Sequence, residues 1–271
     1  MDASILRASL LSVPGVVHGF TTRIGGVSQG AFSSFNLSEK VGDDHQAVES
    51  NRLRLASLLK RPWSEVVGIN QVHGDELLVV DGSPEHLPPS RTLAPEEDRR
   101  FDGSITNRQD ILLAVRTADC LPLLLYAPDK GVVAAVHAGW RGSLSGIAAK
   151  AVAAMKREYG CSPGHMLACL GPCIGPQNFE VGEDVFAAFA DRFGGEVALE
   201  DSRGLYVDLI RANQQHLVDA GLLAEHVESL NLCTHHLAAQ FFSHRRDKGK
   251  TGRQMAFIGL APDPSARQDV S

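Results

Sequence analysis

The chain has 271 residues, of which 44% are hydrophobic and 21% charged, as in a globular protein rather than a disordered or fibrous one. Its formal net charge of -6 provides no general positive field for nucleic acid or an anionic membrane, so an anionic substrate needs a local basic site. No apolar run approaches the ~18 to 20 residues of a membrane span.

The N-terminus and the cysteines indicate the compartment. The first residues carry Asp2 and a single Arg7, and Pro14 interrupts a short apolar stretch, which is unlike a secretory signal. Five cysteines are an odd number and lack the spacing of a small disulfide-stabilised scaffold. We therefore expect a cytoplasmic protein whose thiols bind a metal or react.

Apolar runs and turn residues predict strands and helices in mixed order along the chain. The expected strands lie at 16–20, 66–70, 77–81, 111–115, 121–126, 132–137, 166–170, 227–230 and 255–259. Helices are expected to begin near Asp43 or Asp44, Ser143, Gly182 and Asp208, and the second of them to run to Tyr159. The proline-rich segment 82–100 predicts a mobile loop, and 261–271 a flexible tail. Because the two kinds of element do not alternate strictly, we predict a single α+β domain over 1–271, with mixed sheets covered by helices.

The strands at 121–126 and 132–137 predict a hairpin that brings a cysteine to a histidine. Pro128 and Asp129 suit its turn, and if Ala127 faces Lys130, then Cys120 lies directly opposite His137. Their Cβ atoms would be about 4.5–5.5 Å apart, whereas a one-residue bulge would separate their faces. His73, in Asn70-Gln71-Val72-His73-Gly74, lies where a strand breaks. Two histidines and a thiolate are the three protein ligands of a catalytic zinc site with one open position.

Other interpretations of these residues stay open. Each could be an ordinary buried side chain, and Cys173 or Cys233 could complete a closed structural site. The same trio could bind copper, although none of the four methionines adjoins a ligand motif as an axial ligand would. Cys120 and His137 could also act without metal as the nucleophile and base of a hydrolase. A metal-stabilised binding protein without turnover is the non-enzyme alternative.

Six motifs resemble the YfiH-type family, also called the laccase-domain or polyphenol oxidase family. They are His18-Gly19-Phe20-Thr21-Thr22-Arg23-Ile24-Gly25-Gly26-Val27-Ser28, Asn70-Gln71-Val72-His73-Gly74, Thr117-Ala118-Asp119-Cys120, Val136-His137-Ala138-Gly139-Trp140-Arg141-Gly142, Gly171-Pro172-Cys173-Ile174-Gly175 and Phe242-Ser243-His244-Arg245-Arg246-Asp247. The resemblance spans 18–260 and implies zinc ligands at His73, Cys120 and His137. It also implies an α+β fold related to cysteine hydrolases.

The same resemblance implies phosphorolysis of adenosine and inosine, with adenosine deaminase and methylthioadenosine phosphorylase activities. A role in editing peptidoglycan precursors is ascribed to bacterial members. The zinc deaminase pattern H-x-E…P-C-x-x-C is absent, because Pro172-Cys173 is followed by Ile174 and Gly175, so deamination would need a different site.

Phosphorolysis needs an anion site, and the arginines suggest where it lies. Arg141 precedes the alanine-rich helix, whose first amides carry positive partial charge, and its guanidinium could grip phosphate with two hydrogen bonds. Arg23, Arg245 and Arg246 could converge on the same place. Gln71 is assigned to substrate binding. Asp119, beside Cys120, is a candidate for proton transfer or for orienting the ligands.

The sequence therefore predicts a zinc-dependent purine nucleoside phosphorylase that takes a nucleoside and phosphate and binds neither nucleic acid nor membrane. A copper-dependent polyphenol oxidase and a Cys–His hydrolase are the alternative enzymes.

Overall fold

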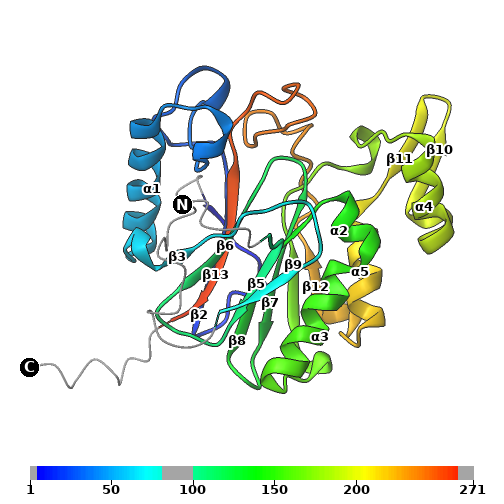
Figure 1. Ribbon diagram of the computed structural model, residues 1–271, viewed down its shortest axis with the longest axis horizontal. Coiled ribbons are helices and arrows are strands. Elements are labelled where there is room, and N and C mark those ends of the chain that lie inside the picture. Colours follow the sequence, from blue (N-terminus) through cyan, green and yellow to red (C-terminus); the bar gives the residue numbers. More distant parts are fainter. Residues whose placement is uncertain (1–4, 81–99, 262–271) are drawn as a thin grey trace, which may run out of the picture.

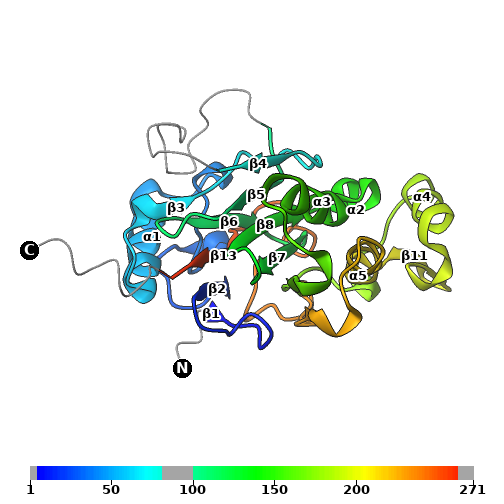
Figure 2. The ribbon, with the colours of Figure 1, turned by 90° about the horizontal axis from the view of Figure 1, so that it is seen from below.

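Two β-sheets packed face to face, with helices on both outer faces, form the body of the protein (Figures 1 and 2). The structure is a computed structural model that describes residues 5–80 and 100–261. The expected loop at 82–100 and the tail at 261–271 fall almost entirely outside the described residues. The α+β class and the mixed sheets are confirmed, and the relation to cysteine-hydrolase folds stays a prediction.

The first sheet has the strand order β1-β2-β13-β6-β3 and is antiparallel except for its β3–β6 pair. Its strands are β1 (Ile5–Leu6), β2 (Val16–Thr21), β13 (Gln254–Leu260), β6 (Leu112–Thr117) and β3 (Val66–Val67). The second sheet has the order β12-β9-β7-β8-β5-β4. It contains β12 (Val227–Ser229), β9 (Leu167–Leu170), β7 (Leu121–Ala127), β8 (Val132–Ala138), β5 (Gly103–Thr106) and β4 (Leu77–Val79). A separate hairpin consists of β10 (Ala198–Asp201) and β11 (Gly204–Val207).

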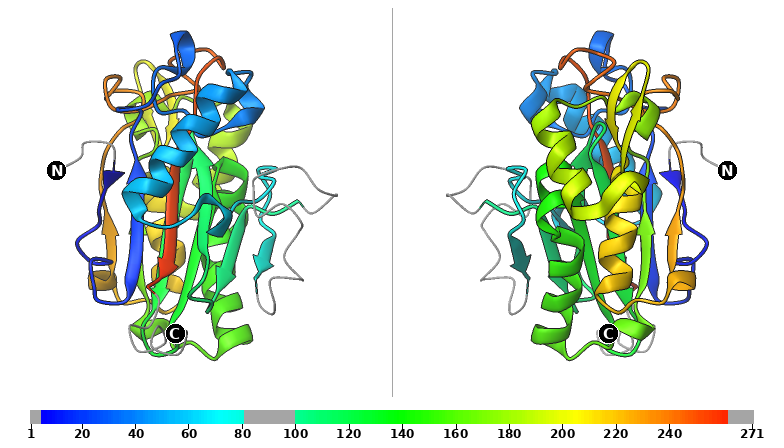
Figure 3. Two further views of the ribbon diagram at one scale, coloured as in Figure 1. Left: turned by 90° about the vertical axis from the view of Figure 1, so that its left-hand side faces the viewer. Right: turned by 90° about the vertical axis from the view of Figure 1, so that its right-hand side faces the viewer.

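Five α-helices occur in the described residues. They are α1 (His45–Leu59), α2 (Trp140–Ser145), α3 (Ile147–Tyr159), α4 (Glu183–Phe193) and α5 (Leu209–Asp219). Helix α1 covers the outer face of the first sheet, and α3 and α5 cover that of the second (Figure 3). None of the described helices has the length and apolar character needed to cross a membrane.

The core lies in three layers because strand side chains alternate between faces. Leu124 and Val133 belong to the apolar layer between the sheets, whereas Leu123 and Val136 belong to the layer under α3. Both faces of β7 and β8 are therefore buried, which explains why these strands appear in the sequence as continuous apolar runs.

The helix starts follow local capping, with one correction. Asp44 accepts a hydrogen bond from the Ala47 N–H (2.8 Å) and Asp208 accepts one from the Arg211 N–H (3.1 Å), so α1 and α5 begin where expected. The expectation of one helix from Ser143 to Tyr159 is wrong. Gly146 has φ of +82° and divides the segment into α2 and α3, because a left-handed residue ends a helix.

The strand predictions are largely confirmed, but the short strands β1, β5, β10 and β11 were not expected. The strand expected at 66–70 is shorter, since β3 ends at Val67 and Asn70 makes only an isolated bridge with Arg100. Short strands such as β5 are stabilised by neighbours distant in sequence rather than by their own pattern.

The predicted hairpin register is also wrong, by two residues. Lys130 N–H donates to Ala127 O (3.3 Å), and Gly131 then adopts φ of +60°, so Ala127 pairs with Val132. His137 consequently faces Pro122, and Cys120 lies in a bend before β7. Because the shift is an even number of residues, it does not move Cys120 to the opposite face.

Candidate metal centre

His137 and Cys120 lie at the same edge of the second sheet. His137 is the next-to-last residue of β8, and Cys120 immediately precedes the antiparallel strand β7. His137 is buried between the sheets, at 3% exposure, whereas Cys120 is half-buried. The hairpin therefore places an imidazole and a thiol together, diagonally across the strand pair.

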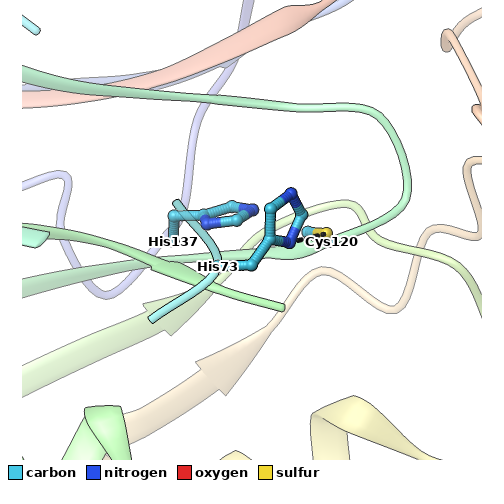
Figure 4. Close-up of side chains that lie close together, drawn as sticks. All are labelled: His73, Cys120 and His137. Carbon is cyan, nitrogen blue, oxygen red and sulfur yellow. Dashed lines mark hydrogen bonds between the residues drawn. The ribbon is translucent and has the colours of Figure 1, made fainter. Parts of the chain in front are cut away.

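His73 reaches this edge from the loop before β4. Its backbone adopts φ of +60°, unusual for a residue with a side chain. The Nδ1 atom of His73 lies 4.0 Å from the Cys120 Sγ, and the His73 and His137 rings are nearly perpendicular, with centroids 4.9 Å apart (Figure 4). The ligand atoms of the three residues all lie within 4.8 Å of one another.

Asp102, which the sequence analysis missed, holds the site together. Its buried carboxylate accepts backbone N–H groups from Val72, His73 and Gly74, at 3.2, 3.0 and 2.6 Å. It also accepts the Nδ1–H of His137 at 2.7 Å. The only local signal is an aspartate just before the short strand β5, where the sequence alone predicted no element.

These donors fit a zinc ion. With Nδ1 of His137 bound to the Asp102 carboxylate, Nε2 is the ring nitrogen left for a metal, which is the usual arrangement at zinc sites. Two imidazoles and a thiolate match the ligands of catalytic zinc. Cys173 and Cys233 are free thiols whose backbones form an isolated β-bridge. Neither belongs to the trio, so the described side chains supply no fourth ligand. None of the described methionines lines the cavity at the site.

The protonation of Cys120 favours metal binding. Burial alone would raise its pKa, but the charges and hydrogen bonds of His137 and His73 outweigh burial and lower the pKa to about 6. Burial lowers the pKa of His137, yet Cys120 and Asp102 raise it to about 9. Both shifts favour the charged pair of thiolate and imidazolium, and a metal ion would displace the imidazolium proton.

Asp119 organises the loops around the site. Its carboxylate accepts hydrogen bonds from Thr234 Oγ1 (2.6 Å), Ser243 Oγ (3.0 Å) and the Arg245 N–H (2.7 Å). Its side chain thus fastens the segment before β13 to the bend that carries Cys120. These contacts use both carboxylate oxygens. The proton-transfer role expected of Asp119 remains a prediction.

A cavity of about 430 Å³ opens beside the trio. Gln71, Arg141 and Arg245 line it, as the sequence analysis expected of substrate-binding residues. The Gln71 amide is held by both backbone groups of Arg116, at 2.8 Å each. Further lining cations, which sequence reasoning missed, are Lys40, Arg116 and Arg253.

Arg23 and Arg246 do not line this cavity. Arg23 donates to the carbonyls of Ser33 (2.7 Å) and Ala238 (3.2 Å) and stacks on Phe242. Arg246 donates to backbone carbonyls and to Asp247. The expected convergence of all four arginines on one anion is therefore wrong for these two, because backbone carbonyls hold their guanidinium groups.

The chain matches one protein family over nearly its whole length. The family model described as "Multi-copper polyphenol oxidoreductase laccase" matches residues 17–261. The YlmD structure from Geobacillus stearothermophilus superposes with a TM-score of 0.87 at 36% identity, covering 96% of this chain and 97% of that one. The chain belongs to the YfiH/YlmD family.

Named relatives agree with this YfiH/YlmD membership. Purine nucleoside phosphorylase YlmD of G. stearothermophilus is 38% identical over 260 residues, covering 94% of this chain and 93% of the relative. A purine nucleoside phosphorylase of Deinococcus radiodurans is 39% identical, covering 94% and 92%. The crystal structure titled hypothetical protein YfiH, from Bacillus licheniformis, has a TM-score of 0.85 at 35% identity, covering 92% and 98%. The resemblance inferred from the motifs is confirmed.

Proposed function

We propose that this YfiH/YlmD-family chain is a zinc-dependent purine nucleoside phosphorylase that takes adenosine, inosine and methylthioadenosine. The observation that carries the proposal is one cavity lined by the metal-binding trio, apolar and aromatic side chains, and five cations. The names of the relatives support it. A cavity of about 430 Å³ is in the range of small-ligand sites.

The reaction joins phosphate to the sugar and releases the base. A phosphate oxygen attacks C1′ of the ribose, the C1′–N9 bond breaks, and its electron pair leaves with the purine, which takes up a proton. Bound zinc supplies Lewis acidity without redox chemistry. The chain's cations bind and orient phosphate, and Trp140 and Phe179 offer aromatic faces for the base.

The first experiment measures metal and products in the same sample. Purified protein should carry about one zinc per chain. It should release hypoxanthine and ribose 1-phosphate from inosine only when phosphate is present. With adenosine, adenine indicates phosphorolysis, whereas inosine indicates the additional deaminase activity. Absence of any phosphate-dependent base release would overturn the proposal.

Oxygen dependence separates this proposal from a copper oxidase. Glycosyl transfer to phosphate moves no electrons to oxygen, so copper-free protein should work equally under air and nitrogen. Copper binds such donors more tightly than zinc, and we expect phenol oxidation only after copper is added. Oxygen-dependent phenol oxidation by copper-free protein would support the oxidase instead.

One observation favours a second candidate, a hydrolase. Cys120, His137 and Asp102 have the relation of nucleophile, base and orienting carboxylate, and the pKa of Cys120 is lowered to about 6. Chelated, zinc-free protein distinguishes the two. A hydrolase would keep hydrolytic activity and lose it to a thiol alkylating reagent, whereas the phosphorylase would lose activity on chelation and recover it with zinc.

A further inference from the structure

Arg116 is buried at the cavity wall with part of its guanidinium unsatisfied. Arg116 is the next-to-last residue of β6, is 8% exposed and lines the cavity. Its Nη2 makes a long contact of 3.5 Å with Ile69 O, and its Nη1 has no hydrogen-bond partner among the described residues. Buried guanidinium donors are normally paired, so Arg116 keeps unused hydrogen-bonding capacity at the cavity wall.

The charges around Arg116 are mostly of its own sign. Lys40, Arg52 and Arg253 are close enough to act on it electrostatically, and Glu39 is the acid there. The Glu39 carboxylate contacts the Arg52 guanidinium. Burial, followed by the charges of Arg52 and Arg253, lowers the pKa of Arg116 to about 10, although Glu39 acts in the opposite direction. Arg116 itself thus meets three cations and one carboxylate, an imbalance that an anion would relieve.

Arg253 and Lys40 place this cationic group beside the metal trio. Arg253 lines the cavity just before β13, and its charge acts on both Cys120 and Asp119. Its Nη1 donates to the carbonyls of Thr251 and Gly252, at 3.0 and 2.9 Å, which fixes the side chain. The Lys40 Nζ donates to Asn70 Oδ1 at 2.6 Å, and its side chain is exposed.

The aromatic side chains of the cavity come from segments packed on the second sheet. Arg116 lies in β6 of the first sheet, and Arg253 lies just before β13 of the same sheet. Trp140 and Phe179 pack against the core of the second sheet. Arg141 lies with the aromatic group, because its guanidinium stacks on Trp140 at 4.3 Å. Arg245 likewise lies 5.4 Å from the Phe179 ring. The cavity therefore has one wall that carries Lys40, Arg116 and Arg253 and a second, aromatic wall that carries Arg141 and Arg245.

We propose that Lys40, Arg116 and Arg253 form the subsite for inorganic phosphate, and that Arg141 serves the nucleoside instead. This inference rests on the proposed phosphorylase function. Arginine suits the tetrahedral anion because its planar group offers paired donors to phosphate oxygens. A phosphate carried by a nucleotide has the same chemistry, so the test must separate the two sources.

Direct titration tests the subsite independently of turnover. Zinc-loaded protein is titrated calorimetrically with inorganic phosphate, and separately with inosine 5′-monophosphate, for the wild type, Lys40→Gln and Arg116→Lys. We expect each variant to bind inorganic phosphate roughly 10- to 150-fold more weakly, the effect of losing a charge-assisted contact. Lys156→Gln, which removes an exposed lysine of α3 that does not line the cavity, should bind as the wild type does.

Steady-state kinetics then test which substrate each wall binds. Lys40→Gln and Arg116→Lys should raise the KM for phosphate with little change in the KM for inosine, and Arg141→Gln should do the reverse. Circular dichroism checks the fold of Arg116→Lys, and Lys40→Gln decides the matter if that variant does not fold.

Three results would overturn or redirect the proposal. Unchanged phosphate binding in both variants would overturn the subsite even if phosphorolysis occurs. Weakened phosphate binding in a protein without phosphorolysis would leave the subsite standing and refute the proposed function. Tighter binding of the nucleotide than of free phosphate, lost in the same variants, would refute inorganic phosphate as the ligand.

Discussion

Asp102 joins the two histidines of the metal centre through a single carboxylate. One oxygen accepts from the His137 ring and the His73 backbone, and the other from the backbone of Val72 and Gly74. Burial disfavours the ionised form, but the hydrogen bond and charge of His137 outweigh it, so the pKa of Asp102 is lowered. One ionised side chain thus sets both a loop conformation and a ring orientation.

Replacing Asp102 by asparagine should weaken zinc binding without unfolding the protein. The amide keeps the size of the side chain but loses the charge and one acceptor atom, and losing such a partner typically costs 10- to 100-fold in metal affinity. Competition with a chelator measures the affinity, and circular dichroism the fold. Asp201→Asn removes a surface carboxylate paired with Arg203 and is the matched control. Equal zinc affinity in the two variants would show that Asp102 only fixes the backbone.

Cys120→Ala should lose most of the zinc and the activity while remaining folded. The thiolate is one of three candidate ligands among the described residues, whereas apolar layers hold the sheets together. Metal content and circular dichroism test this together. Cys233→Ala removes a half-buried thiol outside the trio and should keep its zinc. Full zinc retention by Cys120→Ala would remove that residue from the ligand set.

His18 should make stability depend on pH. It is 2% exposed, and its Nε2 accepts the Ala8 N–H at 3.0 Å. Burial and the charge of Arg7 lower its pKa from 6.5 to about 4. The unfolded chain therefore binds the proton first, so stability present above pH 6.5 is lost as the pH falls toward 4, by about 2 kcal/mol between pH 7 and 5.

Urea unfolding at pH 7 and pH 5 tests the role of His18. The loss of stability between these pH values should be smaller in His18→Gln, whose amide oxygen can still accept the Ala8 N–H but does not titrate. An identical pH dependence in the two proteins would contradict the assignment.

At the scale of elements, the break between α2 and α3 sets the direction of the cavity wall. Gly146 ends α2 in a left-handed conformation, and its N–H bonds back to Gly142 and Ser143. The following helix packs on the second sheet, while α2 presents Trp140 and Arg141 to the cavity. A continuous helix would have a single axis, so it could not follow one direction along the second sheet and another along the cavity.

Gly146→Ala should destabilise the protein by about 1–2 kcal/mol, because a side chain at φ of +82° is strained. The new Cβ would lie 3.4 Å from the His216 ring. Chemical denaturation measures the effect. Gly164→Ala is the control, since its added Cβ would meet nothing within 4 Å and its φ is not positive. Equal stability of the two variants would show that the left-handed conformation at position 146 does not require glycine.

At the scale of the whole molecule, the two sheets share one apolar layer, which includes Leu124 of β7 and Ile258 of β13. The metal site lies at an edge of this layer, where β6 and β8 end and β7 and β13 begin. The centre of the fold therefore does not depend on the metal.

We expect one cooperative unfolding transition, both with zinc and after its removal. Calorimetry and circular dichroism should give the same midpoint, and zinc should raise this midpoint through its binding free energy. Two separate transitions would contradict the single domain predicted for residues 1–271.

The sequence by itself determined the features that depend on nearby residues. Asp44 and Asp208 mark helix starts because a cap acts within three residues. The apolar runs of β7 and β8 predict buried strands because alternate side chains face two different cores. The residue types of the trio indicated a group that could bind a metal, and the motifs indicated the family.

Tertiary structure decided what depends on distant segments. Asp102 meets His73 and His137 only because β5 pairs with β8 and with β4. Lys40, Arg116 and Arg253 come together only where the first sheet and its connections meet the cavity. Arg23 and Arg246 look like anion ligands in the sequence, yet backbone carbonyls hold them. An isolated arginine has the same chemistry in every motif, and packing decides which acceptor it finds.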